Sequence, residues 1–181
     1  LISSLILVIF WASFEQAGGL LNIFAYEKTN RYLPFLNMEI PASWFQSINP
    51  LLIIVLGYSV SVFWMFLKKK NMLATSIFKI SIGIIIMGLG FIFMVFASVE
   101  SEIYGKSSMY WLVLAYLFFT IGELCASPVI LSYITKLSPK ELTASIMGIY
   151  FATIGLGNKL AGVIGQYSQA LGEKAIFIGI T

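Results

Sequence analysis

The sequence predicts an all-α protein whose helices cross a membrane several times. Of its 181 residues, 59% are hydrophobic and only 10% are charged, whereas a soluble domain is roughly 45–50% apolar and about 25% charged. The apolar residues also form blocks long enough to cross a hydrocarbon core of about 30 Å as a helix. Because lipid offers no partners to backbone N–H and C=O groups, each block is expected to be helical.

Five complete spans and the start of a sixth are expected, separated by polar stretches that contain charged residues. The expected spans are residues 1–24, 43–67, 74–98, 109–134 and 142–166, with residues 175–181 as the start of the last helix. The chain begins without Met inside one apolar run and stops inside another. We therefore expect it to be part of a longer protein.

The lysine and arginine residues predict how the spans are oriented. One side of the membrane receives Lys68, Lys69, Lys70, Lys136 and Lys140, and the other receives Lys28, Arg31, Lys106 and Lys174. Because short cytoplasmic loops carry an excess of Lys and Arg, we expect residues 68–73 and 135–141 to be cytoplasmic loops of a multi-pass protein in the inner membrane. The aromatic residues Trp44, Tyr110 and Trp111 open their helices on the opposite side, as an interfacial aromatic belt would.

Several kinds of chemistry are excluded because the required residues are missing. The chain has no His and no Asp, and Cys125 is its single Cys. This excludes a His-based triad, a zinc site of His or Cys, an Asp-based metal cage and an internal disulfide, so neither a metal nor a cofactor is expected. The net charge of +3 gives no reason to expect nucleic acid as a partner. An intramembrane enzyme would have only two acids, one Lys and hydroxyls for its chemistry, so no enzyme is expected.

Glu15 lies near the middle of the first span, where a charged side chain costs roughly 2.5–3.5 kcal/mol by insertion scales. The polar, aromatic and small residues that recur with it at helical spacing are Trp11, Gly18 or Gly19, and Asn22. These residues would share one face, which is expected to meet a cavity or another helix rather than lipid. Two explanations stay open: a buried ion pair that locks two helices, and a gate whose pair forms in one state and breaks in another.

Glu123 has a similar position in the fourth span, on a face with Tyr116, Thr120 and Ser127. Pro128 follows at once; it frees the carbonyl four residues earlier, so the helix is expected to bend beside the carboxylate. An acid beside a free carbonyl is a suitable site for a cationic ammonium group. Burial also disfavours the charged form of an unpaired carboxylate, which can then take up a proton.

The second and fifth spans contain further polar candidates. Asn49 and Pro50 lie in the early turns of the second span, where the proline would kink the helix and the amide could hold another amide or a carboxylate. An interhelical hydrogen bond across the kink explains Asn49 equally well. In the fifth span, Tyr150 stands among small residues spaced four apart, a pattern that permits close approach of helices.

Four strings of the sequence form a recognisable set of motifs. They are FWASFEQ at residues 10–16, IPASWFQSINP at 40–50, GELCASP at 122–128, and MG at 147–148 followed by GN at 157–158. In order, spacing and content this set resembles the motifs of helices seven, eight, ten and eleven of the proton-dependent oligopeptide transporters, a family within the major facilitator superfamily. The strings extend over most of the chain, which makes the resemblance highly specific.

The resemblance implies a transporter of twelve helices, of which this chain is the C-terminal six-helix bundle half, from helix seven to the start of helix twelve. The side chains that the resemblance assigns to substrate binding are Glu123, Asn49, Ser127, Trp11 and Tyr150. By family likeness, Glu123 would hold the amino terminus of a di- or tripeptide, with Ser127 nearby, and Asn49 would contact the peptide backbone. Trp11 and Tyr150 would line pockets for peptide side chains.

The resemblance also implies how transport is driven. Glu15 would pair with a basic residue of the missing N-terminal half, so that the pair closes the outer gate and responds to protonation. The two halves would rock about a site near the bilayer midplane. Small peptides and protons would be the ligands, with the proton as coupling ion and no cofactor.

Three positions depart from the family pattern: Tyr150 stands where Trp is frequent, Ile130 replaces a frequent Gly, and Lys159 occupies a place that is more often aromatic. These departures concern which peptides fit. Two alternatives stay open: a relative that transports another solute, such as an amino acid conjugate or nitrate, and a receptor that keeps the fold without transporting. Glu123 argues for a solute with an ammonium group and against nitrate.

Overall fold

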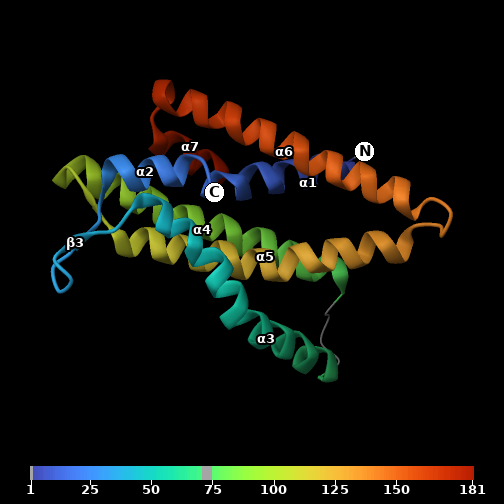
Figure 1. The fold of residues 1–181 in the computed structure, drawn as a ribbon. Coiled ribbons are helices and arrows are strands. Elements are labelled where there is room, and N and C mark those ends of the chain that lie inside the picture. The colour runs from blue at the N-terminus through green and yellow to red at the C-terminus, as the bar shows by residue number, and fades with distance from the viewer. Residues whose placement is uncertain (1, 71–74) are drawn as a thin grey trace.

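Helices make up nearly all of the protein (Figure 1). Its structure is a computed structural model, which describes the backbone of residues 2–70 and 75–181 and the side chains of residues 5–70, 75–168 and 172–181. The α-helices within these residues are α1 (Ile2–Phe14), α2 (Leu20–Lys28), α3 (Ile48–Lys69), α4 (Ser76–Tyr104), α5 (Met109–Leu137), α6 (Thr143–Leu171) and α7 (Glu173–Ile180). In this described part of the chain, five segments are long and apolar enough to cross a membrane: Leu5–Lys28, Ala42–Lys69, Ser76–Tyr104, Met109–Leu137 and Thr143–Ser168. The predicted all-α membrane fold is confirmed.

The first expected span is interrupted near its middle. α1 gives way to one turn of 3-10 helix at Glu15–Ala17, and α2 begins only at Leu20. The backbone N–H groups of Gly18 and Gly19 both donate to the Glu15 carbonyl, over 3.2 and 3.3 Å. Glycine is a poor helix former, and two in succession account for an interruption that the spacing of apolar residues did not predict.

Several helices extend past the apolar blocks that predicted them. The observed ends of α2, α4, α5 and α6 are Lys28, Tyr104, Leu137 and Leu171, against expected ends at residues 24, 98, 134 and 166, and α7 begins at Glu173 rather than 175. Apolar composition marks the part of a helix inside lipid, whereas the helix itself continues until its backbone is capped. Gly105 and Gly172, with φ of 80° and 83°, follow the last residues of α4 and α6. The expected starts at residues 1 and 74, and residues 71–73 of an expected loop, lie outside the described residues.

α4 and α5 form the most extensive helix pair, because two glycines face each other where the helices cross. A Cβ atom on Gly83 would lie 2.6 Å from the Gly122 carbonyl oxygen, and a Cβ atom on Gly122 would lie equally close to the Gly83 carbonyl oxygen. Further along, the buried rings of Phe91 and Phe119 pack with centroids 4.7 Å apart. Phe177 of α7 lies against Phe91 at 6.3 Å. These rings place much of the core between α4, α5 and α7.

α1 packs on α6. An added Cβ on Gly157 of α6 would lie 2.7 Å from the Cβ of Trp11, so these two helices also approach closely.

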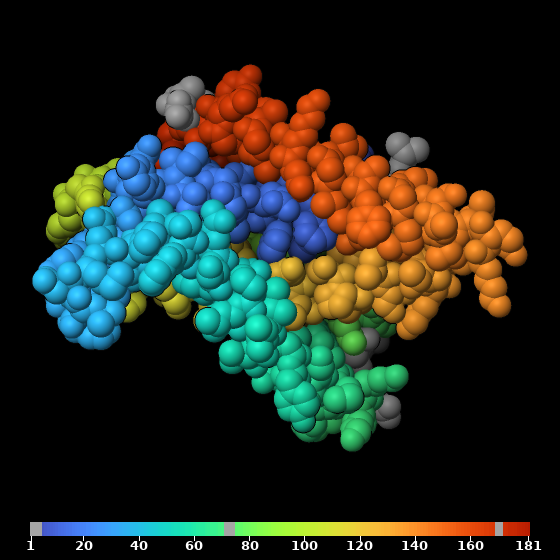
Figure 2. Space-filling model, in the orientation of Figure 1, coloured from blue at the N-terminus to red at the C-terminus, as the bar shows by residue number. Residues whose placement is uncertain are grey.

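α3 differs from all the other long helices. It lies against α5 near its beginning and then diverges from the bundle (Figure 1 and Figure 2). Trp64 is the one buried residue of α3, which is described in full. The other flanks of α3 are apolar and exposed, as expected of surfaces that meet lipid or further helices.

Ion pairs and short strands tie the helices together at one end of the bundle. Lys28 at the end of α2 pairs with Glu173 at the start of α7 over 2.9 Å, and Lys174 pairs with Glu102 of α4 over 2.8 Å. The strands are β1 (Thr29–Asn30), β2 (Tyr32–Leu33), β3 (Met38–Glu39) and β4 (Ser107–Ser108). β1 pairs in parallel with β4, and β2 and β3 form an antiparallel hairpin. These contacts fix α2, α4 and α7 relative to one another at this end.

Candidate functional site

Three polar side chains from two helices meet within the membrane-spanning part of the protein. Asn49 lies in the first turn of α3, and Thr120 and Glu123 lie three residues apart on α5, so both face the same way. The Asn49 Nδ2 atom donates to Glu123 Oε2 over 3.0 Å and to Thr120 Oγ1 over 3.2 Å. The structure therefore joins two of the predicted site residues, which are 74 positions apart in the sequence.

The two prolines lie beside this cluster in different settings. Pro128 is inside α5, which stays one helix from Met109 to Leu137, and the half-buried Ser127 lies one turn from Glu123. Pro50 lies in the first turn of α3, where its missing N–H leaves no helical bond unpaired. The irregularity expected at Pro50 instead precedes it, as the 3-10 helix η2 (Ala42–Ser47).

Glu15, the other predicted acid, lies at the interruption between α1 and α2. It lines an open groove of about 700 Å³, together with Gly18, Gly19 and residues of α6. With its amide nitrogen turned toward the acid, Asn158 donates to Glu15 Oε1 over 3.3 Å and to the Ile154 carbonyl over 3.0 Å. The ion pairs of the described residues do not include Glu15, so its predicted basic partner is not among them.

The interruption separates residues that were expected to share one helix face. Glu15 and Gly18 line the groove beside α6, whereas Asn22 lines a separate hollow. The predicted common face is therefore wrong beyond Gly18, because a 3-10 turn advances further around the axis per residue than an α-helix does.

Three side chains bond to backbone carbonyls at this interruption or beside it. The Tyr116 hydroxyl of α5 donates to the Ala17 carbonyl over 2.8 Å, and Gln46 of η2 donates to the Gly18 carbonyl over 3.5 Å. Gln16 is fully buried, and its amide nitrogen donates to one carbonyl of α1 and one of α6, each 3.3 Å away. Inside a membrane, backbone groups freed from a helix need such partners, so these three side chains stabilise the interruption.

Trp11 and Tyr150, which were expected to line pockets for peptide side chains, are buried in the apolar core of the structure. They are 9% and 5% exposed and belong to the same hydrophobic cluster. Trp11 is held against α6 by the close approach at Gly157. Their role in lining a substrate pocket stays a prediction.

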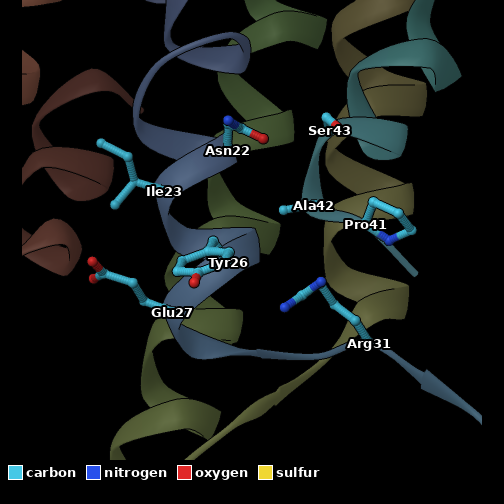
Figure 3. A pocket seen from close by; sticks show the side chains of 8 residues that line it. All are labelled: Asn22, Ile23, Tyr26, Glu27, Arg31, Pro41, Ala42 and Ser43. Atoms are coloured by element: carbon cyan, nitrogen blue, oxygen red, sulfur yellow. The ribbon is translucent and has the colours of Figure 1, made fainter. Parts of the chain in front are cut away.

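A second hollow, of about 500 Å³, lies where α2 ends and the β2–β3 hairpin begins (Figure 3). Arg31 lines it, and its guanidinium donates to the Ile40 carbonyl over 2.5 Å and pairs with Glu39 over 2.7 Å. The same group lies 5.5 Å from the ring centre of Tyr26, which Figure 3 shows on α2. Because these contacts already balance its charge, Arg31 holds the base of the hairpin rather than presenting a free cation to the hollow.

The sequence did not identify every residue of these two sites. Thr120, Tyr116, Gln16 and Asn158 all bond to a site residue or to the interruption. Thr120 and Tyr116 were predicted only to share the face of Glu123, and none of the four was assigned a role. A signal was present in each case, since a polar side chain inside an apolar span needs a partner. The sequence does not show which helix supplies that partner.

Known proteins resemble this chain along nearly its whole length. The POT family (PTR2) matches residues 2–176. The peptide transporter YePEPT of Yersinia enterocolitica is 40% identical over 163 residues, which are 89% of this chain and 32% of that protein. A di-/tripeptide transporter of Lactococcus lactis is 29% identical over 172 residues, which are 94% of this chain and 34% of the relative. The crystal structure of a POT family transporter in complex with 5-aminolevulinic acid matches with a TM-score of 0.84 and 30% identity, over 98% of this chain and 36% of that one. The chain thus spans about a third of the length of these relatives.

Proposed function

The chain belongs to the POT family, and on this basis we propose that it forms the C-terminal half of a proton-coupled symporter of di- and tripeptides that works by alternating access. Its helices match those of a solved POT family transporter, which supports the twelve-helix architecture that the sequence predicts. The observation that supports the function most directly is the bond between Asn49 and Glu123. It places a hydrogen-bonded carboxylate inside a membrane-spanning helix, where an acid marks a functional site by default.

Glu123 would bind the amino terminus of the peptide. A peptide ammonium carries one positive charge and three N–H donors, so it needs a carboxylate and further acceptors. Asn49 engages one carboxylate oxygen of Glu123, Oε2, which leaves Oε1 for the ligand. Ser127 and the Leu124 carbonyl freed by Pro128 would supply the remaining acceptors. An anion such as nitrate would be repelled by the same group.

Glu15 and Glu123 would couple peptide movement to protons. Glu15 would pair with a basic residue of the N-terminal half while the outer gate is closed, and protonation would break that pair and favour the open state. Glu123 would hold the peptide while the gate at Glu15 opens and closes.

Uptake by the full-length protein in proteoliposomes tests this proposal. Under an inward proton gradient, a labelled dipeptide is expected to accumulate above its external concentration, and a protonophore is expected to abolish the accumulation. Equilibration without accumulation would contradict proton coupling while supporting a peptide substrate. Failure of a demonstrably folded protein to take up several di- and tripeptides would contradict the peptide proposal and favour a receptor on the same fold.

A second candidate substrate is a solute other than a peptide that also has an ammonium group. A POT family transporter has been crystallised with 5-aminolevulinic acid, which shares the ammonium and carboxylate of a dipeptide. Unlabelled 5-aminolevulinic acid can therefore be tested as a competitor of labelled dipeptide. Inhibition at lower concentrations than several unlabelled dipeptides require would favour this second candidate.

The basic end of the bundle would face the cytoplasm in the inner membrane. Lys68, Lys136 and Lys140 are exposed at that end, and the positive-inside rule places such residues in the cytoplasm. Cysteine labelling in a Cys125→Ser background measures the orientation. An impermeant maleimide added to intact cells is expected to label a Lys106→Cys variant and to leave a Lys136→Cys variant unlabelled until the cells are opened. The reverse pattern would invert the proposed topology.

A further inference from the structure

Thr120 occupies an unusual position beside the proposed ammonium site, because its hydroxyl hydrogen is already committed. The side chain is completely buried, and Oγ1 donates to the Tyr116 carbonyl one turn earlier in α5, over 2.8 Å. A carbonyl oxygen cannot donate, and a hydroxyl has a single hydrogen. Thr120 can therefore only accept a hydrogen bond from any further partner.

That further partner is Asn49, and the constraint on Thr120 fixes how the Asn49 amide is turned. An acceptor can face only the NH₂ group of an amide, so Nδ2 rather than Oδ1 must face Thr120, as it does over 3.2 Å. The same Nδ2 lies 3.0 Å from Glu123 Oε2. The two hydrogens of Nδ2 thus serve one acceptor each, and the Asn49 oxygen is turned away from both.

We propose that Thr120 is a positioning residue that holds the Asn49 amide in the orientation in which its NH₂ group fixes the Glu123 carboxylate for the ammonium group of a substrate; this inference rests on the proposed function. Without Thr120, a protonated Glu123 could donate to a flipped Asn49 amide, and the amide would lose its fixed orientation. With Thr120 present, the NH₂ group faces Glu123 in either protonation state. Because Nδ2 engages only Oε2, Glu123 Oε1 is then left as an acceptor for an N–H-rich cation.

Replacing Thr120 by Val tests the inference, because Val has the same shape without the hydroxyl. In the full-length protein, Thr120→Val is expected to raise KM for a dipeptide about tenfold, the effect of losing one orienting hydrogen bond, with kcat changed less than about twofold. Thr120→Ser restores the hydroxyl and is expected to restore KM. Ser101→Ala removes a buried hydroxyl that bonds only within α4 and serves as the control with unchanged KM.

An N-acetylated dipeptide distinguishes positioning from a general structural effect. It lacks the ammonium group, so its competition against labelled dipeptide is expected to be the same in wild type and Thr120→Val. The ratio of the affinity for the free dipeptide to that for the N-acetylated dipeptide is therefore expected to be about tenfold smaller in Thr120→Val than in wild type. Equal weakening of both ligands, or a loss of kcat with KM unchanged, would overturn the proposal. If Thr120→Val does not fold, Thr120→Ala is measured with the same expectations. If the wild-type protein recognises no dipeptide, the proposed function fails instead, independently of Thr120.

Discussion

Replacing Glu123 by Gln is expected to abolish gradient-driven accumulation of a dipeptide and to weaken dipeptide binding by about thirtyfold or more. Removing one member of a desolvated, hydrogen-bonded charge pair costs about 2–5 kcal/mol, because the other charge is left without its partner. Gln keeps the shape of Glu and can still bond to Asn49, which donates to Glu123 over 3.0 Å. The loss would therefore report on the charge rather than on packing. Binding of labelled dipeptide in detergent and uptake into proteoliposomes measure the two effects separately.

Glu15→Gln is the matched comparison, because it neutralises the other acid of the same region. Glu15 lines the groove between the α1–α2 interruption and α6, whereas the side chain of Asn49 bonds to Thr120 and Glu123. This variant is expected to bind dipeptide with a Kd near that of wild type and to lose accumulation, since its proposed role is in the gate. Wild-type accumulation by Glu123→Gln would place the ammonium site elsewhere. Equal loss of binding in both variants would contradict the separate roles of the two acids.

The membrane itself explains why so much of the fold was predictable. In lipid, apolar segments must be helical, and an acid within such a segment is rare. Glu15, Glu123 and the five spans could therefore be identified from the neighbouring residues in the sequence. The helix ends were less accurate, since hydrophobicity marks the depth of lipid and not the last helical residue. Lys28 and Glu173 continue α2 and α7 beyond the apolar blocks and pair with each other there.

The interruption at Gly18 and Gly19 was not predictable in the same way, because tertiary contacts stabilise it. The Tyr116 hydroxyl that bonds to Ala17 lies 99 positions away, and Gln16 bonds to a carbonyl 145 positions away. Pair contacts over such separations depend on how helices cross, which a single sequence does not specify. For the same reason the role of Thr120 became apparent only when its distances to Asn49 and Tyr116 were known.

The crossing of α4 and α5 determines where Glu123 lies. This crossing requires glycine, which has no side chain, at two positions. Gly122 immediately precedes Glu123 on α5, and Gly83 faces it from α4. A Cβ atom at Gly83 would also lie 2.8 Å from the Cβ of Ala126. Backbone and Cβ atoms cannot rotate away as a long side chain can, so the two helices would have to separate.

Gly83→Ala is therefore expected to destabilise the protein and lower its apparent unfolding temperature in detergent, with an overpacking cost of about 1–3 kcal/mol. Gly88→Ala is the control in the same helix, because its added Cβ would approach no atom closer than 3.4 Å. Ala is a better helix former than Gly by roughly 1 kcal/mol, so the control is expected to unfold at the same temperature or higher. Both variants replace Gly by Ala, so opposite shifts in their unfolding temperatures would show the effect of packing separately from that of helix propensity. Equal unfolding temperatures for both variants would show that the α4–α5 crossing tolerates a methyl group and that Glu123 is positioned by other contacts.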